Sequence, residues 1–268
     1  MDLEMLRAAV LGIVQGLTEF LPVSSSGHLE ITKFLLGEQA VGKESLILTV
    51  ILHFATALST LYVFRKDIWK ILKELFQKPW NEGQEFTLRI IISMIPAGVI
   101  GFMFEPVFES LFSQRIGFVG FMLLITAALL FIADRPHDRV RSLNRWDAVW
   151  IGCAQAVALL PGISRSGSTL ATSLYLGIDR YKAARFSFLM VVPLILGKVC
   201  YEIILGGALT TSASTGALII GFGTAFISGV LACRWMIRLV MKSQLKYFGI
   251  YCLVVGVFAI ILSIVARG

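Results

Sequence analysis

The sequence predicts an all-α, polytopic membrane protein made of two inverted repeats, with six full transmembrane helices and two re-entrant helical hairpins. Hydrophobic residues make up 57% of the chain and charged residues only 15%, whereas soluble domains carry about 25% charged residues. The apolar runs are long and continuous, which excludes the short alternating segments of a membrane β-barrel. In addition, one Ser-rich motif occurs twice and interrupts apolar helix both times.

The first motif runs from Gln15 to His28 and reads QGLTEFLPVSSSGH. The helix before it, from Met5 to Leu21, is of marginal length for a span, and the helix after it ends by Gly37. We therefore expect a re-entrant hairpin that returns to its side of origin. Irregular backbone at membrane depth needs cover from protein or from a wet cavity, so the break should face an interior site. Acidic residues before the apolar run indicate that the N-terminus is not a cleaved signal peptide.

The full spans are predicted from length, because crossing a hydrocarbon core of about 30 Å takes about 20 apolar residues. Six stretches qualify: residues 46–64, 87–104, 116–133, 184–205, 216–233 and 247–266. The linkers between them are short, which indicates a single integral membrane domain over residues 1–268.

The second motif runs from Gln155 to Thr169 and reads QAVALLPGISRSGST. Its helical parts, about 148–160 and 168–177, are again too short to span, so it predicts a second re-entrant hairpin. An offset of 140 residues aligns the motifs and pairs Gly12 with Gly152, Gln15 with Gln155, Ser24 with Ser164, Ser26 with Ser166 and Gly27 with Gly167. This internal repeat divides the chain into repeat 1, about 1–133, and repeat 2, about 147–268.

The differences between the copies point to function. The first copy has Glu19, Ser25 and His28 where the second has Leu159, Arg165 and Ser168. A repeat kept only for packing has no reason to place its carboxylate and imidazole in one copy and its guanidinium in the other.

The net charge of +7 indicates topology and not a nucleic-acid partner, because Lys and Arg cluster in loops between apolar segments. By the positive-inside rule, the basic loops 65–89, 135–145 and 234–246 are cytoplasmic. The stretches 104–116 and 206–216 together contain one basic residue, which suits the outer face.

Basic residues at 180–185 follow the second hairpin, so this hairpin should start and end on the cytoplasmic side. The first hairpin then starts outside, both termini lie outside, and a pseudo-two-fold axis in the membrane plane relates the repeats. The two breaks are expected to meet near the midplane.

Glu19 lies deep in an apolar helix, where a carboxylate is costly unless a partner or water meets it. It is either a structural partner of Arg165 or a functional group. Gln15, one helical turn earlier on the same face, can orient a water, a hydroxyl or a hydrated cation. His28 suits proton transfer at neutral pH, whereas His53 and His137 are expected to be structural or incidental.

The two breaks also predict an anion site. Half-helices beginning near Gly27 and Gly167 would present backbone N–H groups, and Arg165 adds a planar fork suited to phosphate oxygens. Capping explains Thr169 and Ser168 about as well as substrate contact does. Together these groups describe a phosphoryl site that opens within the bilayer, for which a lipid phosphate is the natural substrate.

At these residues the chain resembles the bacterial undecaprenyl-diphosphate phosphatase (bacitracin resistance protein) family. The family's motifs are (Glu/Gln)xxxGlu leading to Pro-x-Ser-Ser-x-Gly-His, and Pro-Gly-x-Ser-Arg-Ser-Gly; here they read QGLTEFLPVSSSGH and PGISRSGST. The resemblance covers essentially the whole chain. It implies removal of the terminal phosphate of undecaprenyl diphosphate at a site open to the outer face of the bacterial plasma membrane. The product is the carrier lipid of peptidoglycan synthesis.

The resemblance also implies a set of site residues. The catalytic group would be Glu19, Ser25, His28 and Arg165, with substrate-binding residues Gln15, Ser24, Ser26, Ser164, Ser166 and Thr169. The family's activity implies a divalent cation, Mg²⁺ being the expected one. Gln15 stands where many members have Glu, which leaves Glu19 as the one nearby carboxylate and the one candidate metal ligand. We therefore expect Mg²⁺ to arrive with the diphosphate instead of in an all-protein site.

Two questions stay open at the level of sequence. The first is the mechanism. Either Ser25 attacks phosphorus and forms a phosphoserine, with Glu19 or His28 taking the proton of the serine, or His28 activates a water that attacks directly. The rival class is a transporter, because inverted repeats with broken helices are the usual transporter architecture. Expected partners are the lipid substrate and membrane lipids; a homodimer is compatible with the sequence, which does not decide the oligomeric state.

Overall fold

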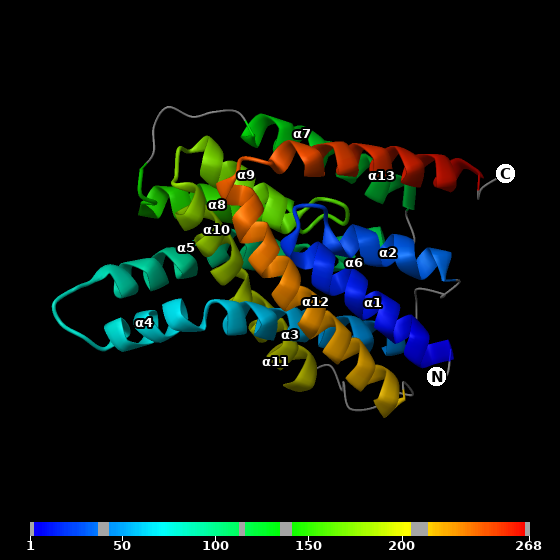
Figure 1. Ribbon diagram of the computed structural model, residues 1–268, viewed down its shortest axis with the longest axis horizontal. Helices are drawn as coiled ribbons and strands as arrows, with labels where there is room; N and C mark the ends of the chain where they lie inside the picture. Colours follow the sequence, from blue (N-terminus) through cyan, green and yellow to red (C-terminus); the bar gives the residue numbers. More distant parts are fainter. Residues whose placement is uncertain (1–2, 37–42, 113–115, 135–140, 205–213, 266–268) are drawn as a thin grey trace.

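The described residues of the chain fold into a bundle of α-helices (Figure 1). The computed structural model describes residues 3–36, 43–112, 116–134, 141–204 and 214–265. Over these residues the regular elements are all helical, which confirms the predicted class. They are α1 (Leu3–Phe20), α2 (Ser25–Leu35), α3 (Lys43–Val63), α4 (Arg65–Leu75), α5 (Glu82–Met103), α6 (Glu105–Phe112), α7 (Ile116–Ala133), α8 (Arg145–Val157), α9 (Arg165–Tyr175), α10 (Arg180–Leu189), α11 (Val191–Ile204), α12 (Thr215–Met241) and α13 (Leu245–Val265).

The protein is a multi-pass membrane protein by the length and composition of its helices. Within the described ranges, α5, α7, α12 and α13 are each long and apolar enough to cross a membrane. The pair α3 and α4, bent by 77° at its break, would make a fifth span if counted together. Helix α7 has the bounds predicted for it, and the predicted spans 87–104 and 216–233 fall almost entirely within α5 and α12. The total of six spans stays a prediction.

The predicted span 184–205 differs most from the structure, which divides this segment into α10 and α11 at Met190. Pro193 follows in the first turn of α11 and lacks the N–H that would bond to the carbonyl of Leu189, so the helix is interrupted there. Residue 205, like residue 266 at the end of the last predicted span, lies outside the described residues.

Helices α1 and α2 form one hairpin and α8 and α9 form another, and the two point toward each other (Figure 1). Helix α1 runs inward from the side of the molecule on which α13 ends, and α2 returns to that side. Helix α8 starts at the opposite side, beside the α4–α5 hairpin, and α9 returns there. The two turns lie in the middle of the molecule. Insertion of the hairpins from opposite faces of a membrane stays a prediction.

Small residues let the first helix of each hairpin pack closely on a long helix. A methyl group on Gly12 of α1 would lie 2.5 Å from the carbonyl oxygen of Gly221 in α12. A methyl group on Gly152 of α8 would lie 2.5 Å from the carbonyl oxygen of Ser93 in α5. Such contacts are typical of helices that associate in membranes through small residues. Because Gly12 and Gly152 are aligned in the repeat, the two hairpins are held in equivalent ways.

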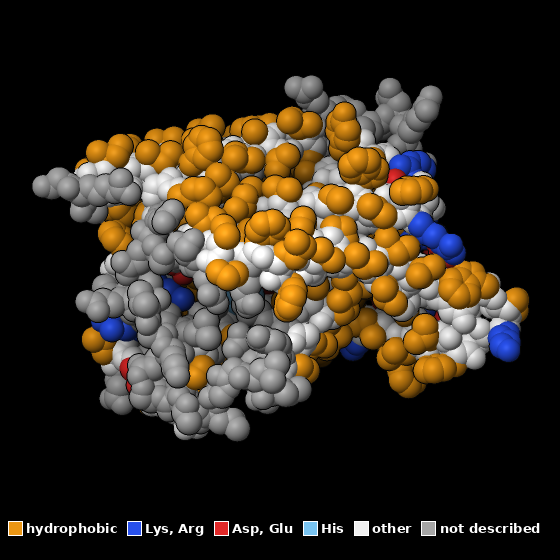
Figure 2. Space-filling model, turned by 180° about the vertical axis from the view of Figure 1, so that it is seen from behind, with side chains coloured by type: hydrophobic (Ala, Val, Ile, Leu, Met, Phe, Trp, Pro, Cys, Tyr) orange, Lys and Arg blue, Asp and Glu red, His pale blue; other side chains and the backbone are white. Residues whose placement is uncertain are grey.

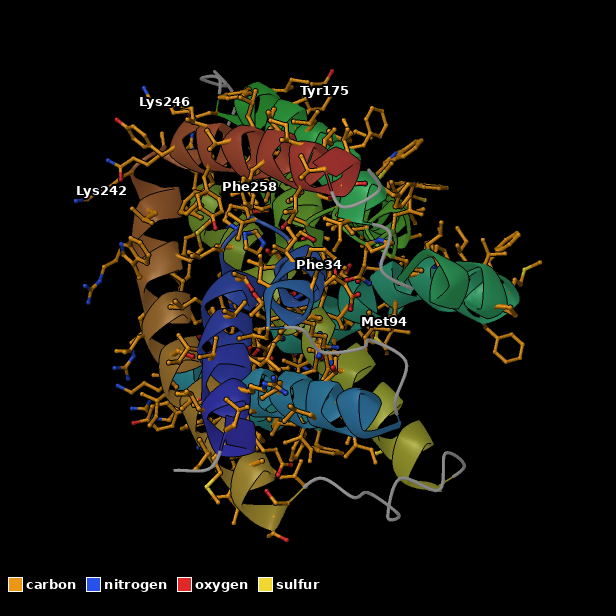
Figure 3. The ribbon with its side chains drawn as sticks, turned by 90° about the vertical axis from the view of Figure 1, so that its right-hand side faces the viewer. Phe34, Met94, Tyr175, Lys242, Lys246 and Phe258 are labelled. Atoms are coloured by element: carbon orange, nitrogen blue, oxygen red, sulfur yellow. The ribbon has the colours of Figure 1, made fainter. Side chains whose placement is uncertain are left out.

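The surface agrees with a membrane environment. Figure 2 shows hydrophobic side chains covering the middle of the molecule, with Lys and Arg gathered mostly toward the end that carries α4. Lys242 and Lys246 point away from the bundle where α12 meets α13 (Figure 3). These two side chains belong to a predicted cytoplasmic loop; residues 135–140 and 205–213, in two other predicted loops, lie outside the described residues.

Candidate active site

The first break separates the end of α1 at Phe20 from the start of α2 at Ser25. Ser24 caps α2, because its Oγ accepts a hydrogen bond from the backbone N–H of Gly27 at 3.3 Å. Ser24 has a φ of 70°, a left-handed conformation that costs energy in a residue other than glycine. The backbone is therefore strained directly beside the predicted catalytic serine.

The second break, after α8 ends at Val157, is built in the same way. Ser164 caps α9 by accepting a hydrogen bond from the N–H of Gly167 at 3.0 Å. Thr126 of α7 holds this turn from the side: its Oγ1 donates to the carbonyl of Gly162 at 3.1 Å and accepts from the N–H of Ser164 at 3.0 Å. Gly162 has a φ of 99°, which favours glycine.

The caps define where the half-helices start. They begin at Ser25 and Arg165, two residues before Gly27 and Gly167, near which they were expected to begin. Ser25 and Arg165 are thus equivalent in the repeat, each being the first residue of its half-helix.

The two turns touch each other. The hydroxyl of Ser166 donates to the carbonyl of Leu21 at 3.1 Å. A methyl group on Gly167 would lie 3.3 Å from Cβ of Pro22, and one on Gly27 would lie 3.2 Å from Cα of Gly162. This contact brings side chains from opposite halves of the chain into one cluster.

Glu19 is the centre of that cluster. Its Oε2 accepts hydrogen bonds from Nε2 of Gln15 at 2.9 Å and from Oγ of Ser25 at 2.7 Å, and its Oε1 accepts one from Nη2 of Arg165. The residue is only 6% exposed. A carboxylate buried this deeply needs charged and hydrogen-bonded partners, and Arg165 and Ser25 supply them.

The cluster forms the polar part of a cavity of about 360 Å³. Glu19, Ser25, Ser26, Gln155 and Arg165 line it together with Thr49 and His53 of α3. The remaining walls are apolar and come mainly from α11 and the second break: Val50, Ala97, Ala158, Leu159, Ile163, Val191, Leu194, Ile195 and Val199. The cavity suits a molecule with a compact anionic end and an apolar body.

The other predicted substrate-binding hydroxyls hold the breaks together. Ser24 and Ser164 are caps, and each lies within hydrogen-bond distance of the serine two residues later, Ser26 or Ser166. Thr169 donates to the carbonyl of Arg165 at 2.9 Å and shares a hydrogen bond with Ser187 of α10. Gln15, Ser24, Ser164, Ser166 and Thr169 are not among the described residues that line the cavity, so their contact with substrate stays a prediction.

His28 faces helix α13. Its Nδ1 lies 2.8 Å from the carbonyl oxygen of Ser24, and its Nε2 lies 2.9 Å from the hydroxyl of Tyr251, whose ring stacks on it at 5.5 Å between centroids. A carbonyl can only accept, so Nδ1 carries a proton and Nε2 faces the phenol. Within the described part of the chain, His28 is not among the cavity-lining residues. Its predicted catalytic role is therefore not supported by a contact with Glu19 or Ser25.

Several residues of the site were missed from sequence. His53, which was expected to be structural or incidental, lines the cavity, and its Nδ1 lies 2.8 Å from the carbonyl of Thr49. Its position as a polar residue within an apolar span was the available signal. Gln155 was recognised only as the repeat partner of Gln15. Nothing in the sequence pointed to Tyr251, and His137 lies outside the described residues.

A resident metal does not fit this site. Among the described residues, no three His, Cys, Asp or Glu side chains lie close enough together to hold a metal ion. Of the carboxylates in the described part of the chain, Glu19 alone lines the cavity, and both of its oxygens already accept hydrogen bonds. A divalent cation would need most of its ligands from water and substrate.

The fold and the site define a class: a helical membrane protein in which two broken hairpins place a guanidinium, a carboxylate and hydroxyls in an apolar-walled cavity. A family model described as bacitracin resistance protein BacA matches residues 8–258. The chain belongs to this family.

Relatives match over almost their whole length. A protein of Christiangramia forsetii named undecaprenyl-diphosphatase is 55% identical over 97% of this chain and 99% of its own. Proteins with the same name from Bacteroides fragilis and Methanobrevibacter smithii are 47% and 36% identical, over 97% and 98% of this chain and 99% of their own.

Proposed function

We propose that this protein is an undecaprenyl-diphosphate phosphatase. It hydrolyses undecaprenyl diphosphate to undecaprenyl phosphate and inorganic phosphate, recycles the lipid carrier for peptidoglycan synthesis, and so confers resistance to bacitracin. The full-length similarity to relatives named undecaprenyl-diphosphatase supports this function. One observation carries the proposed function. Glu19 accepts hydrogen bonds from both Arg165 and Ser25, and all three residues line one cavity.

The protein is proposed to lie in the bacterial plasma membrane with its site open to the outer face. Six spans and two re-entrant hairpins, arranged as inverted repeats, account for the positions of the basic loops. The equivalent caps at Ser24 and Ser164 and the equivalent close contacts of Gly12 and Gly152 support the repeat. The start of α1 and the end of α13 on one side of the molecule agree with both termini being outside (Figure 1).

The cavity explains how a lipid diphosphate is held. Its apolar walls accept the polyprenyl chain beside the head group, and its polar residues hold the diphosphate. Nη2 of Arg165 donates a hydrogen bond to Glu19, whereas Nη1 of Arg165 is buried and has no hydrogen-bond partner among the described residues. Nη1 is thus a donor suited to a phosphoryl oxygen.

In the proposed reaction Oγ of Ser25 attacks the terminal phosphorus. The new bond joins Oγ to phosphorus, the bond from phosphorus to the bridging oxygen breaks, and undecaprenyl phosphate leaves. Glu19 accepts the serine proton, because the two oxygens are 2.7 Å apart. Arg165 stabilises the charge that develops on the phosphoryl oxygens. Water then hydrolyses the phosphoserine and releases phosphate.

The direct attack of water activated by His28 is the alternative. It requires His28 to turn from Tyr251 toward the cavity, whereas Ser25 already contacts Glu19. The geometry therefore favours the phosphoserine route.

Mg²⁺ is proposed to be held mainly by the diphosphate and by water. Bound there, a divalent cation supplies positive charge to the phosphate oxygens. No step of the mechanism above depends on a protein-held metal.

Phosphate release from undecaprenyl diphosphate by the purified protein in detergent, with Mg²⁺, tests the function. A detergent micelle sustains no gradient, so an enzyme releases phosphate there and a transporter does not. Wild type should be active and Arg165→Ala should lose most of the activity. Absence of phosphate release by the folded wild type would favour the transporter.

A further inference from the structure

Gln155 is a buried amide that the protein leaves unsatisfied. It lies on α8, is 2% exposed and lines the cavity. Among the described residues, neither its Oε1 nor its Nε2 has a hydrogen-bond partner. Burying an amide without partners costs stability, and nearly all buried polar groups in native proteins are satisfied. A ligand that completes both hydrogen bonds explains why the residue is there.

The repeat shows why Gln155 is unsatisfied. Its counterpart Gln15 donates from Nε2 to Glu19, four residues later on the same helix. The residue four positions after Gln155 is Leu159, which has no hydrogen-bonding group. The first copy of the repeat therefore uses its amide to hold a catalytic carboxylate, and the second copy presents its amide to the cavity.

The chemistry of the unsatisfied atoms indicates what they bind. Nε2 of Gln155 and Nη1 of Arg165 are donors, and both belong to side chains that line one cavity. Oxygens of a diphosphate accept hydrogen bonds and satisfy donors only. Oε1 of Gln155 is an acceptor, so it needs a donor, and water is the donor that the proposed hydrolysis consumes.

We infer that Gln155 contacts the substrate: its Nε2 donates to a phosphoryl oxygen beside Arg165, and its Oε1 accepts from a water molecule next to that phosphoryl group. This inference rests on the proposed function and adds a substrate-binding residue to it. In the hydrolysis step the oxygen of the held water forms the bond to phosphorus and its proton passes to a phosphoryl oxygen. The bond from phosphorus to Oγ of Ser25 breaks, and Glu19 returns to Oγ the proton that it accepted in the first step.

The variant that tests this is Gln155→Met, which keeps the size of the side chain and removes both polar atoms. Three quantities are measured on detergent-purified protein: the thermal unfolding midpoint without ligand, the affinity for methylene diphosphonate with Mg²⁺, and the kinetics with undecaprenyl diphosphate. Cys153→Ala, an exposed change on the same helix, is the matched control.

For Gln155→Met we expect an unfolding midpoint equal to or above that of wild type, because an unsatisfied buried amide has been removed. The affinity for the diphosphonate and the kcat/KM should each fall about 10-fold to 100-fold, as for loss of a hydrogen bond to a charged group. Cys153→Ala should match wild type in all three.

A lower midpoint with unchanged diphosphonate affinity would overturn the inference, because Gln155 would then serve packing alone. Wild-type kinetics in Gln155→Met would overturn it as well, while leaving the proposed function intact. Failure of the wild type itself to release phosphate would instead refute the proposed function, so the two failures are distinguishable.

Discussion

The guanidinium of Arg165 donates a hydrogen bond to the carboxylate of Glu19, across 146 positions of sequence. The two residues come from hairpins that point toward each other from opposite sides of the molecule (Figure 1). The catalytic proposal depends on this contact, because the base for Ser25 comes from the first hairpin and the guanidinium for the phosphoryl group comes from the second.

The first prediction concerns the stability of this pair. Arg165→Met leaves the Glu19 carboxylate buried without its cation, and the free energy of unfolding should fall by about 3–5 kcal/mol. The double variant Glu19→Gln/Arg165→Met should recover most of that loss without recovering activity. Thermal or denaturant unfolding in detergent measures both. A single variant as stable as wild type would show that the pair is not energetically coupled.

Ser25 provides the second prediction. Ser25→Ala should reduce kcat by about 1,000-fold or more, because the nucleophile is lost. Rapid quenching of the wild type during turnover should trap phosphate on Ser25, detectable by mass spectrometry of the peptide. Full turnover by Ser25→Ala would eliminate the phosphoserine route and favour attack by water.

The third prediction concerns Tyr251, whose hydroxyl lies 2.9 Å from Nε2 of His28. In the phosphoserine route Glu19 is the base and His28 stays beside Tyr251, so Tyr251→Phe should leave kcat within about 2-fold of wild type. Tyr247→Phe, an exposed change one turn earlier on α13, is the control. A fall in kcat of about 10-fold or more in Tyr251→Phe alone would favour attack by water that His28 activates.

A fourth prediction tests the equivalence of the two hairpins. Gly12→Ala and Gly152→Ala should each destabilise the protein by about 1–3 kcal/mol, because each new methyl group would lie 2.5 Å from a carbonyl oxygen of the neighbouring helix. Gly223→Ala in α12, where a methyl group meets no atom within 4 Å, should be neutral or slightly stabilising. Unfolding midpoints compare the three. A stable Gly152→Ala would show that the second hairpin tolerates looser packing than the first.

The fifth prediction concerns metal removal. Among the described residues, no three metal-binding side chains lie close enough together to hold a metal ion. EDTA should therefore leave the unfolding midpoint of the substrate-free protein unchanged, and it should abolish phosphate release because it removes the cation bound by the diphosphate. Calcium or magnesium added without substrate should likewise not stabilise the protein. A clear rise in the midpoint on adding Mg²⁺ alone would indicate a protein-held metal site.

The sequence predicts best those features of the fold that local chemistry decides. Long apolar runs fixed the bounds of α7 closely, and the Ser/Gly breaks led directly to the capped turns at Ser24 and Ser164. The pairing of Glu19 with Arg165 could be expected because a carboxylate in an apolar helix needs a partner. The repeat offered the only guanidinium at an equivalent break.

The misses arose from contacts between elements distant in sequence. Tyr251 reaches His28 only because α13 packs beside α2, and His53 reaches the cavity only because α3 passes the two breaks. Pro193 was the sequence signal for the break of segment 184–205 at Met190. This signal does not decide the matter, because a membrane helix can also contain a proline, as α5 contains Pro96. The sequence shows which residues are present, but the packing of distant helices decides which of their side chains meet.

A double-mutant cycle on kcat/KM tests the central claim most directly, namely that the two hairpins form one phosphatase site. Wild type, Glu19→Gln, Arg165→Gln and the double variant are compared by phosphate release from undecaprenyl diphosphate in detergent. We predict an active wild type, single variants about 100-fold to 1,000-fold weaker, and a double variant no weaker than the weaker single variant, because the residues act as a unit. An inactive wild type, or single effects that simply multiply in the double variant, would contradict the account.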